Sequence, residues 1–430
     1  MGIAELESLY GSKHIRSLPS AALLDIPAAE INFKRLGGTL KVAQLLNILP
    51  SASWKSAYDY LAKNIPKHLE YLPAGTFTLG LSVYGLDVNE RKLSADMLSL
   101  KKIIKATGRS VRIVPNKTLE LNSAQVLHNN LTKRGAWELL MVRDGQQTYL
   151  AQTFFVQDIE SYAARDQARP KRDARVGMLP PKLAQIIINL AVGQIEGLGA
   201  RVEGIDSTIN PRPLPLRLLD PFCGTGVILQ EGLLMGYHVI GTDLDPRMVE
   251  YAKANIQWLF GKYPELQTQV VIEQGDATDH QWPRFSAVAS EVYLGRPLNS
   301  LPAPDKLKEI IEDVNTITKK FLKNLAKQLK PGQKAALAIP AWRKNVIGPT
   351  YHSSAFMHLP LLDAFDSPKA RSASTLSKGA KGSSVERVDN LTSLGYNRVS
   401  FVHVKNDELI YFREDQVVAR ELLIVERLEK

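Results

Sequence analysis

Cysteine is almost absent from this sequence, which has a single one, Cys223, among 430 residues. The composition therefore excludes an intramolecular disulfide and a zinc site built on several cysteines. The eight histidines are scattered, with no pair at the spacing of helical metal ligands, and we expect no metal. A reducing compartment fits the scarcity of cysteine.

Long apolar runs are also lacking. No stretch approaches the roughly 18 residues that a helix needs to span a bilayer. The start of the chain lacks the basic and then apolar pattern of a secretion signal. These absences predict a cytoplasmic protein with no membrane partner.

Positive charge, by contrast, is in excess. The 54 lysines and arginines outnumber the 44 aspartates and glutamates, which gives a net charge of +10 and a pI near 9.4. Such a balance favours a polyanionic partner, either nucleic acid or an anionic membrane surface. The length predicts about two or three domains, and 44% hydrophobic with 23% charged residues excludes wholesale disorder.

Residues 1–160 have the pattern of an α+β region. Short strand-like and helix-like segments alternate here, and Asp144-Gly145 is a typical hairpin turn. The expected elements are strands at 77–84 and 110–114, helices at 93–106 and 123–131, and a hairpin of 137–142 with 147–156.

Residues 161–182 form a basic junction between two regions. Prolines 170, 180 and 181 forbid a continuous helix. The segment is either a solvated linker or a positively charged strap that contacts RNA. Its candidate RNA-binding residues are Arg165, Arg169, Lys171, Arg172 and Arg175.

Residues 183–430 alternate strands and helices at the spacing of βαβ units. This order predicts a parallel sheet covered on both faces. The expected elements are helices at 183–192, 227–235, 248–260 and 306–329, strands at 216–219, 238–242, 269–273, 287–290 and 334–339, and terminal strands at 398–404 and 408–413. The Ser-, Gly- and Lys-rich segment Ser367–Arg387 is expected to be a mobile loop, or alternatively a lid over RNA or substrate.

A glycine-containing loop follows the first of these strands. Glycines 224 and 226 permit a tight turn and a close approach of backbone to ligand. A dinucleotide fingerprint would need a third glycine where Leu229 stands, and no phosphate-binding P-loop motif occurs. The candidate cofactor residues of this loop are Asp220, Pro221, Phe222, Cys223, Gly224, Thr225 and Gly226.

Two more candidate positions lie after the next strands. Asp243, followed by Leu244, can accept hydrogen bonds from both ribose hydroxyls of a nucleoside. Asp276, followed by Ala277, can accept one from an adenine amine. Each aspartate alone is equally consistent with a helix cap or a turn. Together with the glycine loop they favour S-adenosylmethionine (SAM).

The stretch Leu218–Asn255 resembles motifs I and II of Rossmann-fold methyltransferases. More specifically, the chain resembles the THUMP-containing tRNA guanine-N2-methyltransferases that act on guanosine 10. Further similar segments are Arg35–Thr39, Gly80–Gly85, Gly108–Arg112, Ser123–Leu127, Arg169–Asp173 and Gly177–Ala184. The resemblance implies an α/β, Rossmann-like class I SAM-dependent methyltransferase domain at 183–430 and a THUMP-type RNA-binding module within 1–160. It places Pro181 near the methionine end of SAM, and related eukaryotic enzymes use a small activator subunit.

The chain departs from this family at the catalytic motif, which is Asp/Asn-Pro-Pro-Tyr/Phe. Both prolines are missing from the corresponding segment, Ala287–Gly295. Either Glu291 and Tyr293 orient and stack the target base in a shorter loop, or Ser290 takes the place of the acid and catalysis is impaired. The expected activity is methylation of the exocyclic N2 of guanosine in tRNA. The alternatives are a DNA or adenine-N6 methyltransferase, and a SAM-binding or RNA-binding protein with little or no transfer activity.

Overall fold

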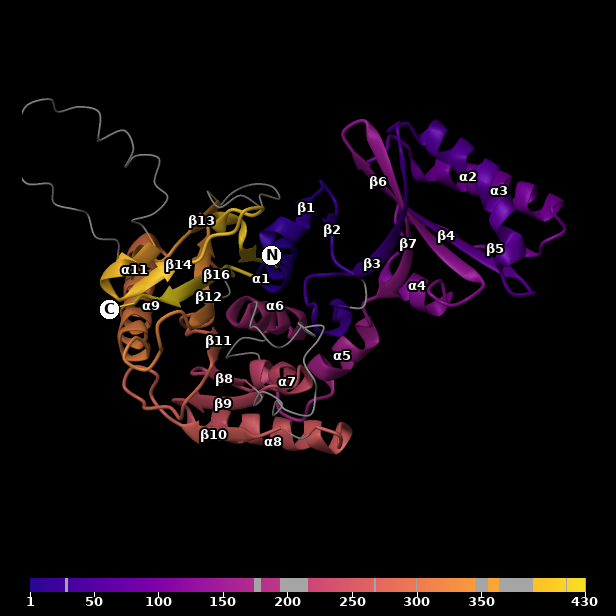
Figure 1. The fold of residues 1–430 in the computed structure, drawn as a ribbon. Coiled ribbons are helices and arrows are strands. Elements are labelled where there is room, and N and C mark those ends of the chain that lie inside the picture. The colour runs from indigo at the N-terminus through magenta and orange to yellow at the C-terminus, as the bar shows by residue number, and fades with distance from the viewer. Residues whose placement is uncertain are drawn as a thin grey trace, which may run out of the picture. The chain divides into compact units, whose positions relative to one another are not determined.

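The chain forms two compact units in the computed structural model, Lys13–Ala164 and Met1–Ser12 with Arg165–Lys430 (Figure 1). The structure describes residues 1–27, 30–173, 179–193, 216–266, 268–298, 300–344, 355–362, 390–414 and 416–429. Arg175 and the segment Ser367–Arg387 lie outside the described residues.

The unit Lys13–Ala164 is built on a five-stranded sheet in the order β3-β7-β6-β4-β5. Its strands are β3 (Lys41–Leu49), β4 (Phe77–Tyr84), β5 (Val111–Ile113), β6 (Ala136–Asp144) and β7 (Gln147–Val156), and β1 (Ile15–Ser17) pairs with β2 (Ala22–Leu24) apart from it. The predicted hairpin is confirmed, since β6 and β7 pair and Gly145 adopts a φ of 57° in the turn.

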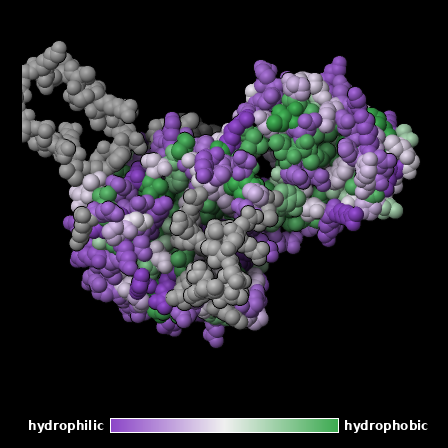
Figure 2. Space-filling view, in the orientation of Figure 1, coloured by the Kyte–Doolittle hydropathy of each residue, from purple (hydrophilic) through white to green (hydrophobic). Residues whose placement is uncertain are grey.

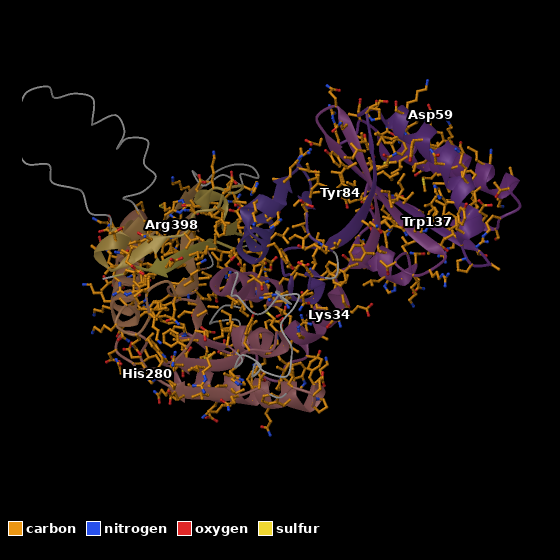
Figure 3. The ribbon with its side chains drawn as sticks, viewed as in Figure 1. Lys34, Asp59, Tyr84, Trp137, His280 and Arg398 are labelled. Carbon is orange, nitrogen blue, oxygen red and sulfur yellow. The ribbon has the colours of Figure 1, made fainter. Side chains whose placement is uncertain are left out.

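Helices α2 (Trp54–His68) and α3 (Glu90–Ala106) share a core with β4. Leucines and isoleucines at helical spacing supply the buried face of each helix. Trp137 of β6, labelled in Figure 3, packs against this core. Its ring lies edge-on to that of Phe77, with 4.9 Å between ring centroids. A second, smaller core includes Val126 of α4 (Ser123–His128).

The other unit is an α/β domain whose sheet has the order β10-β9-β8-β11-β12-β16-β14. The strands are β8 (Arg217–Asp220), β9 (His238–Asp243), β10 (Val270–Gln274), β11 (Ala287–Glu291), β12 (Lys334–Arg343), β13 (Phe356–Met357), β14 (Tyr396–Arg398), β15 (Ile410–Tyr411) and β16 (Val418–Arg427). Strands β8 to β12 are parallel and β16 is antiparallel to β12. The predicted Rossmann-like α/β fold is therefore confirmed.

Helices cover both faces of this sheet. Helices α6 (Pro181–Val192), α7 (Val227–Leu234) and α8 (Pro246–Lys262) pack on one face, and α9 (Pro304–Leu325) packs on the other. Because β8 to β11 are parallel, the loops that follow them gather at one edge of the sheet. Helix α9 starts at that edge, after β11, and returns to the opposite edge where β12 begins.

The first residues of the chain belong to this α/β unit, whereas the sequence analysis grouped them with the N-terminal region. Helix α1 (Gly2–Tyr10) buries Glu5, whose carboxylate accepts a 2.6 Å hydrogen bond from Asn189 of α6. The Glu7 carboxylate accepts bonds from the backbone amides of Val402 and His403, at 2.6 and 3.1 Å. These acidic side chains attach the helix to the α/β unit.

The predicted pairing of strands 398–404 and 408–413 is wrong, because the short strands found there, β14 and β15, each pair with β16. The main strand of this region is β16, which lies between β12 and β14 and pairs with both. Its segment Leu422–Val425 is fully buried, but it is flanked by Arg420 and Glu421, whose charges hide the apolar pattern in the sequence. Within the described parts of the chain, no helix is long and apolar enough to cross a membrane.

Candidate functional site

The glycine loop connects β8 to α7 at the carboxyl edge of the sheet. Gly224 and Gly226 have φ angles of 48° and 85°, in the left-handed region that favours glycine. A Cβ on Gly226 would also lie 3.2 Å from the Cβ of Ala252 in α8. The loop therefore requires glycine at residue 226 for both its conformation and its packing.

Asp220, the last residue of β8, is buried beneath this loop. Its Oδ1 accepts a 2.6 Å hydrogen bond from the Ser290 hydroxyl and a longer one, 3.3 Å, from the Phe222 amide. Burial raises the pKa of Asp220 to about 7. Ser290 has no exposed surface, so its hydroxyl supports Asp220 and does not face an open site.

Cys223 and Phe222 are held by the neighbouring core. The Cys223 amide donates to the Thr242 carbonyl at 2.8 Å, and burial raises the pKa of the Cys223 thiol. The ring of Phe222 packs edge-on against Phe321 of α9. The loop is therefore held by the Cys223 backbone and by the ring of Phe222, which packs on the α9 side of the sheet.

Asp243 joins the glycine loop to the loop after β9. Its Oδ2 accepts a 2.8 Å hydrogen bond from the Gly224 amide, and its Oδ1 accepts one from the Asp245 amide at 3.0 Å. Burial raises the pKa of the Asp243 carboxyl. The next residue, Leu244, is 65% exposed despite being apolar. A carboxylate and an open apolar side chain thus lie together at the end of β9.

Asp276 follows β10 in a third loop. The Gly275 amide donates to the Asp243 carbonyl at 3.0 Å, which brings this loop beside the second one. Asp276 is exposed, and its Oδ1 accepts a hydrogen bond from the Thr278 amide at 2.8 Å. Ala277 is buried. The three candidate cofactor loops are therefore adjacent, as the sequence predicted.

Glu291 ends β11, the next strand of the same edge. Its Oε1 accepts a hydrogen bond from Nε of Arg420 on β16, and Arg420 also donates to the Gln416 side chain at 3.2 Å. Burial raises the pKa of the Glu291 carboxyl, and the Arg420 guanidinium opposes that rise. Two residues further on, Tyr293 is 39% exposed. A largely buried, paired carboxylate and an open aromatic ring thus stand next to the three loops.

The first part of the basic junction is helical, in α5 (Ile159–Gln167). Nε and an Nη of Arg165 donate to the two carboxylate oxygens of Glu231 in α7, at 2.8 and 3.2 Å. The Gln185 side chain of α6 also donates to Glu231, at 3.0 Å. Arg165 and Glu231 are both buried, so this ion pair is a contact inside the α/β unit.

The following segment, Arg169–Asp173, crosses the glycine loop. The Arg169 guanidinium donates to the Thr225 hydroxyl at 3.0 Å and is 3% exposed, and burial lowers the pKa of Arg169. Asn255 of α8 bonds the backbone of Lys171 in both directions, at 2.9 Å, and donates to the Thr225 carbonyl at 2.8 Å. We call Arg169–Asp173 the strap.

These contacts correct part of the sequence analysis. Arg165 and Arg169 were expected to meet RNA, but both side chains are buried against the glycine loop and its helix. Lys171 and Arg172 are exposed as expected. Pro181 is the first residue of α6 and is buried.

Three functional-site partners were missed by the sequence reasoning: Glu231, Asn255 and Arg420. The available signal was a polar residue inside a mostly buried helix or strand, as with Gln230 and Glu231 in VILQEGLL. In the part of the chain that the structure describes, no group of three or more His, Cys, Asp or Glu side chains could hold a metal ion.

The parallel strands β8 to β12, the antiparallel β16 beside them and the glycine loop at the carboxyl edge define a Rossmann-like α/β domain. No model of a known protein family matches the chain. Its sequence is 40% identical over 94 residues to the tRNA (guanine(10)-N2)-dimethyltransferase of Methanothermobacter thermautotrophicus, covering 21% of this chain and 22% of that protein. It is 28% identical over 182 residues to the enzyme of the same name from Methanocaldococcus jannaschii, covering 38% and 45%.

These matches confirm the resemblance to the tRNA guanine-N2-methyltransferases. The chain spans less than half the length of these curated relatives. Among solved structures, TrmN from Thermus thermophilus aligns over 99% of this chain and 96% of its own, with 16% identity and a TM-score of 0.45.

Proposed function

We propose that the α/β unit binds SAM and methylates the exocyclic N2 of a guanosine in tRNA. The observation that carries this proposal is the contact of three strand-end loops around Asp243, with Glu291 and Tyr293 on the next strand end. The activity for which the sequence relatives are named supports the same reaction.

The residues at the edge fit SAM by their chemistry. The Asp243 carboxylate suits the ribose hydroxyls, and the exposed Leu244 side chain offers an apolar surface to adenine. Asp276 is exposed and can accept from the adenine amine. The residues proposed to hold the cofactor are Asp220, Pro221, Phe222, Cys223, Gly224, Thr225, Gly226, Asp243, Leu244, Asp276, Ala277 and Pro181. SAM supplies an electrophilic methyl group.

Glu291 and Tyr293 act on the target base in this proposal. An exocyclic amine is a poor nucleophile, because its lone pair is delocalised into the ring, so its orientation matters most. Glu291 accepts an N–H bond through the carboxylate oxygen that is not bonded to Arg420, and Tyr293 stacks on the base. With SAM bound, its methyl group would pass to the amine that Glu291 orients, leaving S-adenosylhomocysteine, and the amine would release one proton to solvent water. Ser290 is buried against Asp220 and is not assigned to this step.

The unit Lys13–Ala164 is proposed to bind the RNA as a THUMP-type module, with Lys171 and Arg172 as further contacts. Folded RNA is recognised largely by shape and phosphate contacts. The resemblance also suggests a small activator subunit, which adding candidate partners to the assay would test. A cytoplasmic location fits the single buried cysteine.

The first test is Glu291→Ala. We expect methyl transfer to tRNA to fall about a hundredfold or more, because the amine is no longer oriented, while calorimetry shows SAM affinity nearly unchanged. The exposed Glu265→Ala is the matched control and should keep full activity. Unchanged turnover of Glu291→Ala in a radiolabelled-methyl assay would overturn the assignment.

A second candidate function is a SAM-binding protein without transfer activity. The observation in its favour is the ion pair of Glu291 with Arg420, which engages one oxygen of the proposed acceptor. Nucleoside mass spectrometry of tRNA from cells with and without the protein decides between the two. Loss of N2-methylguanosine supports the enzyme, and competition between tRNA and duplex DNA tests the choice of nucleic acid.

A further inference from the structure

Helix α9 has two halves of different charge. In the first half, Lys306 pairs with Glu309 at 2.7 Å and Lys308 with Glu312 at 3.9 Å. The second half and the turn after it contain no acidic residue from Val314 to Gln333. The two halves therefore differ in whether their lysines are neutralised.

Five lysines of the acid-free part form what we call the lysine stripe: Lys319, Lys320, Lys323, Lys327 and Lys330. The last four are exposed and Lys319 is half-buried. Among the described residues, none of the five ammonium groups lies within ion-pair distance of a carboxylate. The stripe is therefore a patch of uncompensated positive charge.

The spacing of Lys319, Lys320 and Lys323 places them on one side of α9, and Lys327 and Lys330 follow in the turn after the helix. Steps of three and four residues recur along it, while Val314, Phe321 and Leu325 face the core. At 1.5 Å per residue, the helical part from Lys319 to Leu325 covers roughly 9 Å, and the turn that carries Lys327 and Lys330 extends the stripe further. The stripe is thus long enough to meet several phosphates of one nucleic-acid strand.

An arginine extends the positive surface beyond the helix. The Trp282 amide donates to the Gln328 side chain at 2.9 Å, and the Phe285 carbonyl accepts from Gln333 at 3.1 Å. Arg284, which lies between these two residues in sequence, is exposed. It therefore stands beside the turn that carries Lys327 and Lys330.

The surface around the lysine stripe is charged and has no exposed large apolar side chain. None of the exposed large hydrophobic side chains belongs to α9 or to the turn that follows, and hydrophilic residues dominate the surface over this region (Figure 2). Protein interfaces depend on buried aromatic and apolar anchors. A phosphate backbone, in contrast, is bound by cations alone.

We propose that the lysine stripe binds the phosphate backbone of the substrate RNA at a distance from the target base. This inference rests on the proposed function. The stripe lies on the half of α9 that returns to the opposite edge of the sheet from Glu291. It therefore contributes to the binding of RNA and not to the chemical step.

The test compares two matched double variants. Lys320→Gln with Lys323→Gln removes two charges of the stripe, and Lys306→Gln with Lys308→Gln removes two neutralised charges from the same helix. Binding of unfractionated tRNA is measured by fluorescence anisotropy at several salt concentrations. We expect the stripe variant to bind several-fold more weakly, with a salt slope smaller by about 0.7 to 0.9 per lost phosphate contact. The control variant should bind as the wild type does.

Turnover and folding are measured on the same proteins. The stripe variant should show a raised KM for tRNA with an unchanged kcat, and circular dichroism should show that both variants are folded. Equal effects of the two variants, or an unchanged salt slope, would overturn the inference. Preferential binding of the stripe to phosphatidylserine vesicles over tRNA would overturn it as well. Failure of the wild-type protein to bind or methylate tRNA would instead refute the proposed function itself.

Discussion

Glu291 and Arg420 are 129 residues apart in sequence, yet their side chains form an ion pair at the end of the central strand. The pair fixes one carboxylate oxygen and opposes the effect of burial on the Glu291 carboxyl. A carboxylate accepts N–H bonds best when it is ionised. Arg420 is thus a positioning residue for the proposed acceptor.

Replacing Arg420 tests this role through pH. Without the guanidinium the pKa of Glu291 rises further, so the carboxylate is protonated at a higher pH. For Arg420→Met we expect the acid limb of the methyl-transfer rate to move to higher pH, measured with saturating SAM and tRNA. Arg420→Lys keeps the charge and should keep the limb near its wild-type position. An Arg420→Met profile that coincides with the wild type would contradict this role.

Among the elements, the strap is the one whose structure differs most from the prediction. Its composition indicated a solvated or RNA-binding segment, but Arg169 and the Lys171 backbone hold Thr225 and Asn255 instead. Composition reports only the charge of a side chain. Whether that charge meets solvent or a buried hydroxyl depends on helices α7 and α8, which come later in the chain.

The strap prediction concerns cofactor affinity. Arg169→Met leaves the Thr225 hydroxyl without its donor, and a hydrogen bond to a charged group contributes about 1.5 to 3 kcal/mol. We expect roughly tenfold or more weaker SAM binding in calorimetry, with the salt dependence of tRNA binding unchanged. Lys308→Met, exposed on α9, serves as the control. Normal SAM affinity in Arg169→Met, or a reduced salt slope, would restore the RNA-binding interpretation.

Other elements differed in how well the sequence predicted them. Strand β4 and the β6–β7 hairpin were placed closely, because apolar alternation and the Asp-Gly turn are local signals. Strands β3 and β16 were not predicted. β16 lies between two strands and is buried on both faces, so Arg420 and Glu421 interrupt its pattern while each finds a charged partner.

At the scale of the whole molecule, one of the two units is made of two segments that are separate in the sequence. The first helix folds with residues that follow Arg165, and the unit Lys13–Ala164 is inserted between them in sequence. Ala4 and Glu5 have no exposed surface, and Glu5 holds the equally buried Asn189. The α/β unit is therefore built from the chain segments that precede and follow Lys13–Ala164.

Deletion of residues 1–12 tests this arrangement. The α/β unit loses buried apolar contacts and the hydrogen bond between Glu5 and Asn189, which together cost about 3 kcal/mol or more. Hydrogen exchange should show reduced protection in α6 and β16, with α3 and β4 as the internal control. Equal loss of protection in both units, or no loss in either, would refute the assignment of residues 1–12 to the α/β unit.

Local structure and the class of the site could be predicted from short-range sequence patterns. Apolar periodicity and the glycine and Asp-Gly signals depend only on residues that are close in sequence. These local signals were enough to place Gly224, Gly226, Asp243 and Glu291 at or just after strand ends. Tertiary structure decided which charges are buried and with which partners. In the sequence, Arg165, Arg169 and Arg420 cannot be distinguished from exposed arginines. They are buried only because helices and strands that are distant in the sequence pack around them.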